Sequence, residues 1–222
     1  PRPGTAYLAS QTGASILPIG LVGLNDIFPL KLGKRPTIKF QIGTPFHPKK
    51  ITGRGRERRK ELDELGQAQA RQAAVEMQSL QLGNIITSPL LRCQQTAAPL
   101  AQMWNVVPQV CAEVSEIPSP KGVAMSDRIV WLRQAMQGTW SELGSDYVAY
   151  RDCITDFVRG IQTDTVIFSH FIAINAVIGG VIGDDRLVIR SLDNCSITVF
   201  ERDATGSLSL VHGGHEADTL IR

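Results

Sequence analysis

His170 stands at a junction between a strand-like and a helix-like segment. Residues 166–168, Val-Ile-Phe, form a β-favouring apolar run, and residues 171–182 are rich in alanine and isoleucine and have the length of a helix. A helix N-terminus carries unpaired N–H groups and a partial positive charge, so a histidine placed there is positioned to bind an anion such as phosphate. The alternative is a hydrogen-bonded histidine that only caps the helix.

Arg92 follows a second junction of the same kind. Residues 84–87 are predicted to form a short strand, and the Ser88-Pro89 pair is typical of a helix start, with Ser88 as the N-cap and Arg92 one turn inside the helix. If both strands lie in one parallel sheet, both junctions lie at the same edge. A guanidinium and an imidazole can then bind one anion together.

Length and composition are those of an ordinary globular protein. The chain has 222 residues, 43% hydrophobic and 20% charged, which fits one or two domains. The best apolar run, residues 16–24, is too short to span a bilayer. The four cysteines lack metal-binding or redox spacing, which predicts free thiols and a cytoplasmic location. The first residue, Pro1, indicates a fragment or a trimmed start.

Charge divides the chain into two parts. Residues 1–60 contain 12 Lys/Arg and 2 Asp/Glu, a net charge of +10, whereas residues 61–222 have a net charge of −8. The basic peak over residues 49–60 could contact nucleic acid or acidic lipid. No aromatic residues interleave with its charges to stack on bases, so a solvated linker over residues 51–64 is favoured and no nucleic-acid partner is expected.

The first 50 residues resemble a known family. A helix is expected over residues 5–12, and strands are expected over residues 15–23 and 37–43. The blocks Pro-Gly-Thr-Ala-Tyr-Leu-Ala (3–9), Ile-Leu-Pro-Ile-Gly-Leu-Val-Gly (16–23) and Ile-Lys-Phe-Gln-Ile-Gly-Thr-Pro (38–45) resemble the C-terminal part of lysophosphatidate-type glycerophospholipid acyltransferases. That family's His-x4-Asp and Glu-Gly-Thr-Arg blocks are absent from the sequence. Without the catalytic base, the segment is interpreted as a relic of an acyltransferase.

The remainder, from about residue 65, resembles a second family. A helix opens near Gly66 and ends at Gly83. Four blocks then match in order the histidine phosphatase superfamily, in its phosphoglycerate-mutase-like branch. They are Leu-Gly-Gln-Ala-Gln-Ala (65–70), Thr-Ser-Pro-Leu-Leu-Arg-Cys-Gln-Gln-Thr-Ala (87–97), Phe-Ser-His-Phe (168–171) and Asp-Asn-Cys-Ser-Ile-Thr-Val (193–199). Residues 65–222 are therefore predicted to form a histidine-phosphatase-like domain.

This resemblance assigns candidate site residues. Arg92 matches the arginine that holds the phosphate, and His170 matches the second pocket histidine. Phe171, which opens the helix, joins them in the phosphate-binding set. Glu116 sits where many members carry the acid that protonates the leaving oxygen, with Glu113 as the alternative. The resemblance implies catalysis without metal or cofactor, on a phosphorylated small molecule, with inorganic phosphate as a further ligand.

One block of that family is missing. Its nucleophile is the histidine of an Arg-His-Gly block at the end of the first strand, and this sequence contains no Arg-His-Gly. The acyltransferase-like segment occupies the corresponding position. The expected function is a phosphomonoester phosphatase acting through a phosphohistidine, impaired or inactive as given. A non-catalytic phosphate-binding or interaction module is the alternative.

The remaining segments suggest accessory features. Residues 121–160 form a helical insertion that either caps the pocket or packs as core, and it contains Trp131, Met136, Trp140 and Tyr147. Residues 187–189 are expected to form a strand. His212 and His215 could bind a metal, but no third ligand is evident. The expected fold is α/β, with a mostly parallel sheet, helices on both faces and no N-terminal strand; the oligomeric state stays open.

Overall fold

The computed structural model describes residues 19–22, 39–42, 56–80, 83–120, 122–124 and 127–214, with side chains from residue 63 onward. The chain divides into two compact units, residues 1–61 with 217–222 and residues 62–216.

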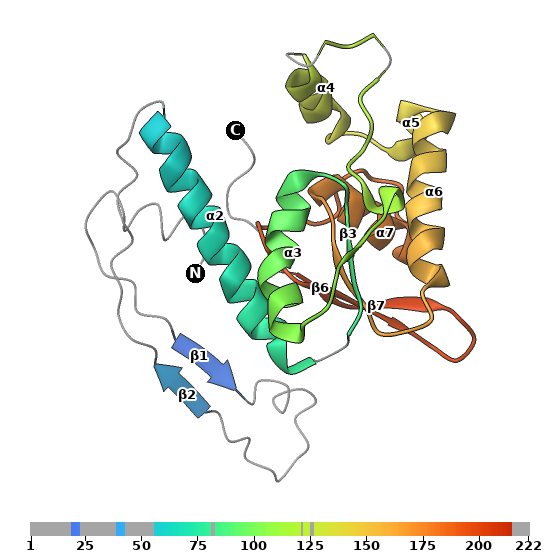
Figure 1. Cartoon of the computed structure of the whole chain (residues 1–222). Helices are drawn as coiled ribbons and strands as arrows, with labels where there is room; N and C mark the ends of the chain where they lie inside the picture. Colours follow the sequence, from blue (N-terminus) through green and yellow to red (C-terminus); the bar gives the residue numbers. More distant parts are fainter. Residues whose placement is uncertain are drawn as a thin grey trace. The chain divides into compact units, whose positions relative to one another are not determined.

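The first unit contains one described strand pair. Strands β1 (Ile19–Val22) and β2 (Lys39–Ile42) pair antiparallel, with Ile19 opposite Ile42 and Val22 opposite Lys39. The two strands are the blue arrows labelled β1 and β2 in Figure 1. The strands predicted over residues 15–23 and 37–43 are confirmed for these residues. The helix predicted over residues 5–12 lies outside the described residues.

The second unit is built on a parallel sheet. Strand β3 (Ile85–Thr87) lies between β4 (Gln109–Val110) and β5 (Val166–Phe168), and both neighbours run parallel to it. Thr87 pairs with Phe168, so β3 and β5 end at the same level. The two predicted strands and their parallel arrangement are confirmed.

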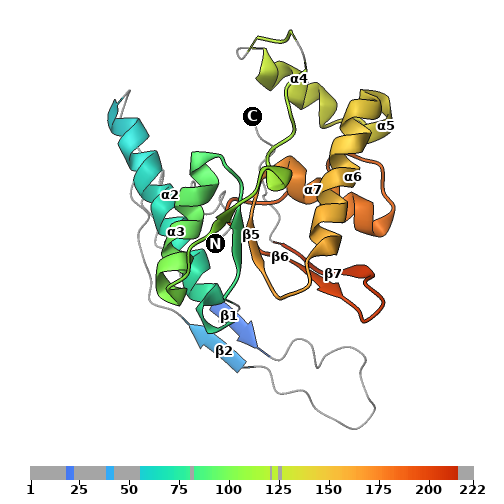
Figure 2. The same ribbon diagram turned by 45° about the vertical axis from the view of Figure 1, so that its right-hand side comes forward.

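Helices cover both faces of this sheet, as predicted (Figure 2). On one face, side chains of β3 and β5 pack against α2 (Arg56–Met77) and α3 (Leu91–Trp104). The sheet residues of this face are Ile85, Val166 and Phe168. On the other face, Ile86 and Ile167 pack with Phe157 of α6 (Ser145–Gly160). Successive residues of each strand thus point to opposite faces, as the pleat requires.

Helix α2 begins earlier than predicted. It starts at Arg56 rather than near Gly66 and ends at Met77, where a 3-10 turn, η2 (Gln78–Leu80), follows. Residues 56–64 of the predicted linker are therefore helical. Glutamate, leucine, glutamine and alanine flank Gly66, and their helix propensities outweigh the roughly 1 kcal/mol that one interior glycine costs. The domain boundaries remain predictions.

Helix α7 (Phe171–Ile182) has the bounds expected from the sequence and packs on α6. The crossing is close at Gly180, where an added Cβ would collide with Thr155 of α6. Apolar residues of both helices form the largest core cluster with the fully buried Trp140. A larger residue at position 180 would separate the two helices.

The strand predicted over residues 187–189 is absent, and this prediction was wrong. Its backbone groups find another partner, the fully buried Asn175 of α7. The Asn175 side chain accepts hydrogen bonds from the N–H groups of Ile189 and Arg190, both at 2.8 Å, and donates to the carbonyls of Phe171 and Arg190. Because an amide side chain satisfies these groups, the loop needs no neighbouring strand.

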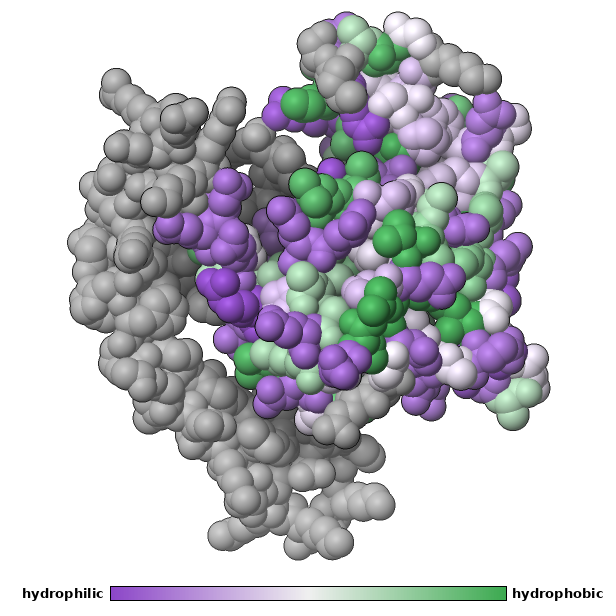
Figure 3. Space-filling view, viewed as in Figure 1, coloured by the Kyte–Doolittle hydropathy of each residue, from purple (hydrophilic) through white to green (hydrophobic). Residues whose placement is uncertain are grey.

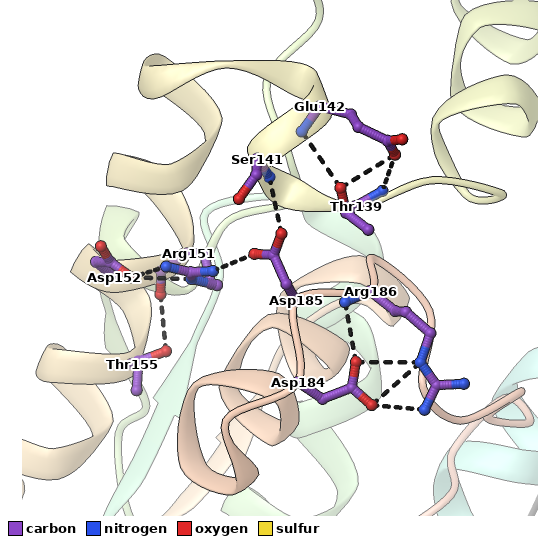
Figure 4. A network of polar contacts seen from close by, with 9 residues as sticks. All are labelled: Thr139, Ser141, Glu142, Arg151, Asp152, Thr155, Asp184, Asp185 and Arg186. Carbon is purple, nitrogen blue, oxygen red and sulfur yellow. Dashed lines mark hydrogen bonds and ion pairs between the residues drawn. The ribbon is translucent and has the colours of Figure 1, made fainter.

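The insertion over residues 121–160 contains α4 (Arg128–Ala135), α5 (Trp140–Leu143) and α6. A polar network joins α5 and α6 to the loop after α7 (Figure 4). At its centre, Asp185 accepts hydrogen bonds from the N–H of Ser141 at 3.2 Å and from Arg151 at 2.7 Å. The network fixes the end of the insertion against α7, the helix that follows His170.

The chain ends, within the described residues, in an antiparallel hairpin. It consists of β6 (Thr198–Arg202) and β7 (Leu208–Gly213), and it forms a separate two-stranded sheet. Among the described residues β5 therefore has a strand partner on one side only. This explains why β5 is only half-buried.

The visible surface of the second unit mixes hydrophilic and hydrophobic side chains (Figure 3). Exposed apolar residues include Leu91 of α3 and Ile129 of α4. Within the described part of the chain, no helix combines the length and apolar character that crossing a bilayer requires.

Candidate active site

The junctions after β3 and β5 lie at one edge of the sheet, as the sequence predicted. The pairing continues one residue past β3, because the N–H of Ser88 donates to the carbonyl of Phe168 at 3.0 Å. The chain then turns into α3 on one side and, through Ser169 and His170, into α7 on the other. The two turns are thus held next to each other by sheet hydrogen bonds.

Arg92 and His170 meet directly. The guanidinium of Arg92 lies against Nδ1 of the His170 ring, with Nε at 3.2 Å and a terminal nitrogen at 2.7 Å. Arginine can only donate hydrogen bonds, so Nδ1 must accept and the ring proton of neutral His170 is assigned to Nε2. Nε2 lies 2.7 Å from Oγ of Ser88, which accepts this proton.

Ser88 does not cap α3, and that prediction was wrong. The N-cap residue is Leu90 and no side chain caps the helix, which places Arg92 at the second helical position rather than one turn inside. The Ser88 side chain is fully buried, and its Oγ accepts from the N–H of Leu90 at 3.2 Å as well as from His170. The Ser88 hydroxyl, which was expected to cap α3, instead accepts a hydrogen bond from the His170 ring.

The environment of His170 disfavours a charged ring. Its side chain is only 4% exposed. Burial, and then the positive charges of Arg92 and Arg128, lower the pKa of His170 to about 4. Near neutral pH the ring is therefore uncharged, in agreement with the tautomer that the hydrogen bonds require.

Glu116 follows the 3-10 turn η3 (Ala112–Val114) and lies in the same electrostatic field. Burial raises the pKa of the Glu116 carboxyl, and this effect is opposed by a hydrogen bond from the N–H of Ile117 at 3.0 Å and by the charges of Arg92 and Arg128. Glu113 lies in η3 itself, is exposed, and its charge acts on Cys111. The charge of Arg92 acts on the Glu116 carboxyl, and Glu116 is less exposed than Glu113.

Phe171 is the first residue of α7 and half-buried. Its side chain packs against the core cluster of α6 and α7. Only its backbone N–H, one of those that a helix start leaves without an intrahelical partner, has the chemistry to bind an anion.

Cys93 is a site residue that sequence reasoning missed. Its buried Sγ donates to the carbonyl of Ser169 at 3.2 Å and lies 3.5 Å from Nε2 of His170. Burial raises the pKa of the Cys93 thiol to about 11 against the opposing charge of Arg92. The protonated thiol lies close to both ring nitrogens of His170 and links the two turns through its hydrogen bond to Ser169. The only signal in the sequence was its position next to Arg92.

Arg128, the first residue of α4, was also missed. It donates hydrogen bonds to Oγ of Ser119 at 2.5 Å and to the carbonyl of Ile117 at 3.1 Å. Its charge acts on Glu116 and on His170. Nothing in the sequence pattern of the insertion distinguished this arginine from a solvated one.

The aromatic residues of the insertion divide between the core and its border. Trp140 is fully buried, whereas Trp131 and Tyr147 are half-buried and contact each other as a tilted ring pair with centroids 5.6 Å apart. Tyr150 donates its hydroxyl proton to the carbonyl of Ser115 at 2.8 Å, next to Glu116. Helix α6 thereby supports the segment that carries the acid.

Metal binding finds no support in the described residues, where no group of three His, Cys, Asp or Glu side chains could hold an ion. His212 lies on β7, and His215 is outside the described residues.

Comparison with known families gives one clear match. The model of the histidine phosphatase superfamily (branch 1) matches residues 49–212. No curated protein matches significantly in sequence.

Several solved structures are similar to this chain. A protein described as mycobacterial hydrolase 1 is 20% identical, with a TM-score of 0.55 over 69% of this chain and 86% of that chain. A mycobacterial glucosyl-3-phosphoglycerate phosphatase is 20% identical, with a TM-score of 0.53 over 69% of this chain and 88% of the other. An alpha-ribazole phosphatase from Shigella flexneri is 15% identical, with a TM-score of 0.54 over 71% and 86%. At these identities the likeness establishes the fold.

Proposed function

The chain belongs to the histidine phosphatase superfamily (branch 1), and we propose on that premise that its site binds the phosphoryl group of a phosphomonoester through Arg92 and His170. The observation that carries the proposal is the direct contact between these two side chains across adjacent parallel strands. A guanidinium and a ring nitrogen fixed within 2.7 Å of each other can both reach the oxygens of one phosphoryl group.

Binding changes the partners within the site. In the structure Arg92 donates to Nδ1 of His170, so an entering phosphate must take over the guanidinium. Nδ1 then loses its donor partner, and the nearby anion favours a protonated ring that donates to the phosphate. The N–H of Phe171 at the start of α7 adds a further donor.

Glu116 is proposed as the general acid. A carboxyl group must be protonated to donate to a leaving oxygen, and the raised pKa of Glu116 favours that form. In the transfer step a nucleophile forms a bond to phosphorus while the bond to the leaving oxygen breaks. That oxygen keeps the electron pair and takes the proton of Glu116.

The nucleophile is the open part of this mechanism. These 222 residues contain four histidines and no Arg-His-Gly block. His170 flanks the phosphate, and its Nε2 already donates to Ser88. We therefore propose that the 222-residue chain binds phosphate and turns over phosphomonoesters poorly or not at all.

The solved relatives support a phosphate ligand. The mycobacterial glucosyl-3-phosphoglycerate phosphatase has been solved as complexes with VO3 and with inorganic phosphate. The substrate of the present chain is proposed only as a phosphorylated small molecule. Its cytoplasmic location and the acyltransferase-like origin of residues 1–50 stay predictions.

Two measurements test the proposal and separate the enzyme from a binding module. Calorimetric titration with inorganic phosphate should give weak binding, about millimolar, that Arg92→Ala abolishes. Arg133→Ala, on the exposed side of α4, is the matched control. Unchanged binding by Arg92→Ala would refute the shared site.

Hydrolysis of p-nitrophenyl phosphate gives the second measurement. The wild type is expected to be no faster than His170→Ala and to form no acid-labile, base-stable phosphoprotein. A burst of product with a phosphohistidine mapped to His47, His212 or His215 would establish catalysis and overturn the impaired form of the proposal.

A further inference from the structure

The segment that carries Glu116 is held from both sides. Glu116 is followed by Ile117, whose N–H donates to the Glu116 carboxyl and whose carbonyl accepts from Arg128 of α4. On the preceding side, the carbonyl of Ser115 accepts from Tyr150 of α6. The guanidinium of Arg128 thus lies against the same short stretch of backbone that presents the proposed acid.

The hydrogen bonds of Arg128 to described residues use only part of its donors. A guanidinium carries five N–H groups. The hydrogen bonds to Ser119 and to Ile117 use one on each terminal nitrogen. The side chain is half-buried, so part of it is exposed to solvent.

Among the described residues, no carboxylate forms an ion pair with Arg128. Between described residues, the ion pairs lie on α6 and in the loop after α7 and involve neither Arg92 nor Arg128. The same two arginines affect both titratable site groups, because each lowers the pKa of His170 and each opposes the rise in the pKa of Glu116. Two guanidinium groups, from α3 and from α4, therefore act on one small region.

This arrangement matches the charge of a phosphomonoester. Arg92 and Arg128 together carry two positive charges, and a phosphate monoester near neutral pH carries about two negative ones. A single arginine supplies only half of this positive charge, and an anion in a partly buried site needs close positive partners.

We propose that Arg128 is the second cationic residue of the phosphate site, donating its remaining guanidinium N–H groups to the phosphoryl oxygens opposite Arg92. The inference rests on the proposed function, since it assigns a further residue to the same site. It also gives the insertion a defined task, which is to supply one of the two charges that hold the substrate.

Calorimetric titration with inorganic phosphate tests this with three variants. Arg128→Met should weaken binding about ten- to a hundredfold, the range expected for losing a hydrogen bond to a charged group. Arg128→Lys keeps the positive charge but lacks the forked arrangement of guanidinium donors. Its phosphate affinity should lie between those of Arg128→Met and the wild type. Arg133→Met removes an exposed charge from the last turn of the same helix and should bind like wild type.

A purely structural role for Arg128 predicts a different pattern. If the arginine only positioned Glu116, then Arg128→Met would have no further effect on phosphate binding in a Glu116→Gln background, and that result would overturn the inference. A persistent loss in this background, with an unchanged thermal transition, supports direct binding. The background variant itself keeps the hydrogen-bond acceptor of the Glu116 side chain.

Arg92→Met separates this inference from the proposed function. Loss of binding in Arg92→Met together with wild-type affinity in Arg128→Met would refute the role of Arg128 and leave the site intact. Absence of phosphate binding by the wild type would refute the site itself.

Discussion

The protonation of His170 can be measured directly and follows from two features of its surroundings. The ring is buried, and it lies beside the guanidinium of Arg92. Its pKa is expected near 4 instead of the ordinary 6.5. At about 1.36 kcal/mol per pKa unit, charging the ring in the folded protein costs about 3 kcal/mol more than in the unfolded chain.

The sign of the effect on stability follows from this difference. Below pH 6.5 the unfolded chain binds a proton at His170 and the folded protein does not, so folding stability falls as the pH drops from 6.5 to about 4. The wild type should therefore lose up to about 3 kcal/mol over this window relative to a His170→Asn variant. The raised pKa of Glu116 acts in the opposite direction, and the comparison between variants removes its contribution.

Imidazole NMR titration is the direct assay. The His170 signal is identified by its loss in His170→Asn, and its pKa is read from the shift between pH 3.5 and 8. Arg92→Met should raise this pKa without restoring 6.5, because burial is the larger cause. A wild-type pKa near 6.5 would refute the effect of burial on the ring, and a pKa unaffected by Arg92→Met would refute the effect of the Arg92 charge on it.

Three further variants or labels probe the framework of the site. Asn175→Leu leaves backbone groups of the following loop unpaired and should cost about 3 kcal/mol in urea denaturation, whereas a loss below 1 kcal/mol would contradict the role of this amide. Gly180→Ala forces α6 and α7 apart and should cost about 1–3 kcal/mol, while Gly160→Ala, which meets open space, should cost nothing; equal midpoints would show that the crossing is not close. Iodoacetamide followed by mass spectrometry should label exposed Cys153 in the folded protein well before buried Cys93, and the reverse order would contradict the buried, protonated thiol.

The parts of the fold that the sequence predicted well are those with a strong local signal. The run of β-branched and aromatic residues at 166–168 and the apolar helix that follows were both confirmed. Parallel pairing of the two strands then brought Arg92 and His170 together, as expected. Arg92 and His170 converge because their strands are parallel neighbours. Two strand-to-helix junctions in the sequence are enough to indicate this topology, even when no side-chain contact is known.

The sequence-based predictions failed where a side chain forms hydrogen bonds with a residue far away in the sequence. Ser88 has the local signature of a helix cap, but its hydroxyl binds an imidazole 82 residues away in the sequence. Residues 187–189 look like a strand, yet Asn175 from the preceding helix satisfies the loop. Arg128 could not be recognised for the same reason, because its importance lies in contacts with the Glu116 segment.

The pairing of Thr87 with Phe168 also has a practical consequence for protein engineering. Register between strands changes only in whole residues, and a slip of one residue turns every side chain to the other face. The separation of Arg92 and His170 therefore cannot be tuned by small steps in strand length. Tags or fused domains can be inserted at the tip of the β6–β7 hairpin, near Gly206, without altering this spacing, whereas insertions between Ser88 and Arg92 would displace the guanidinium.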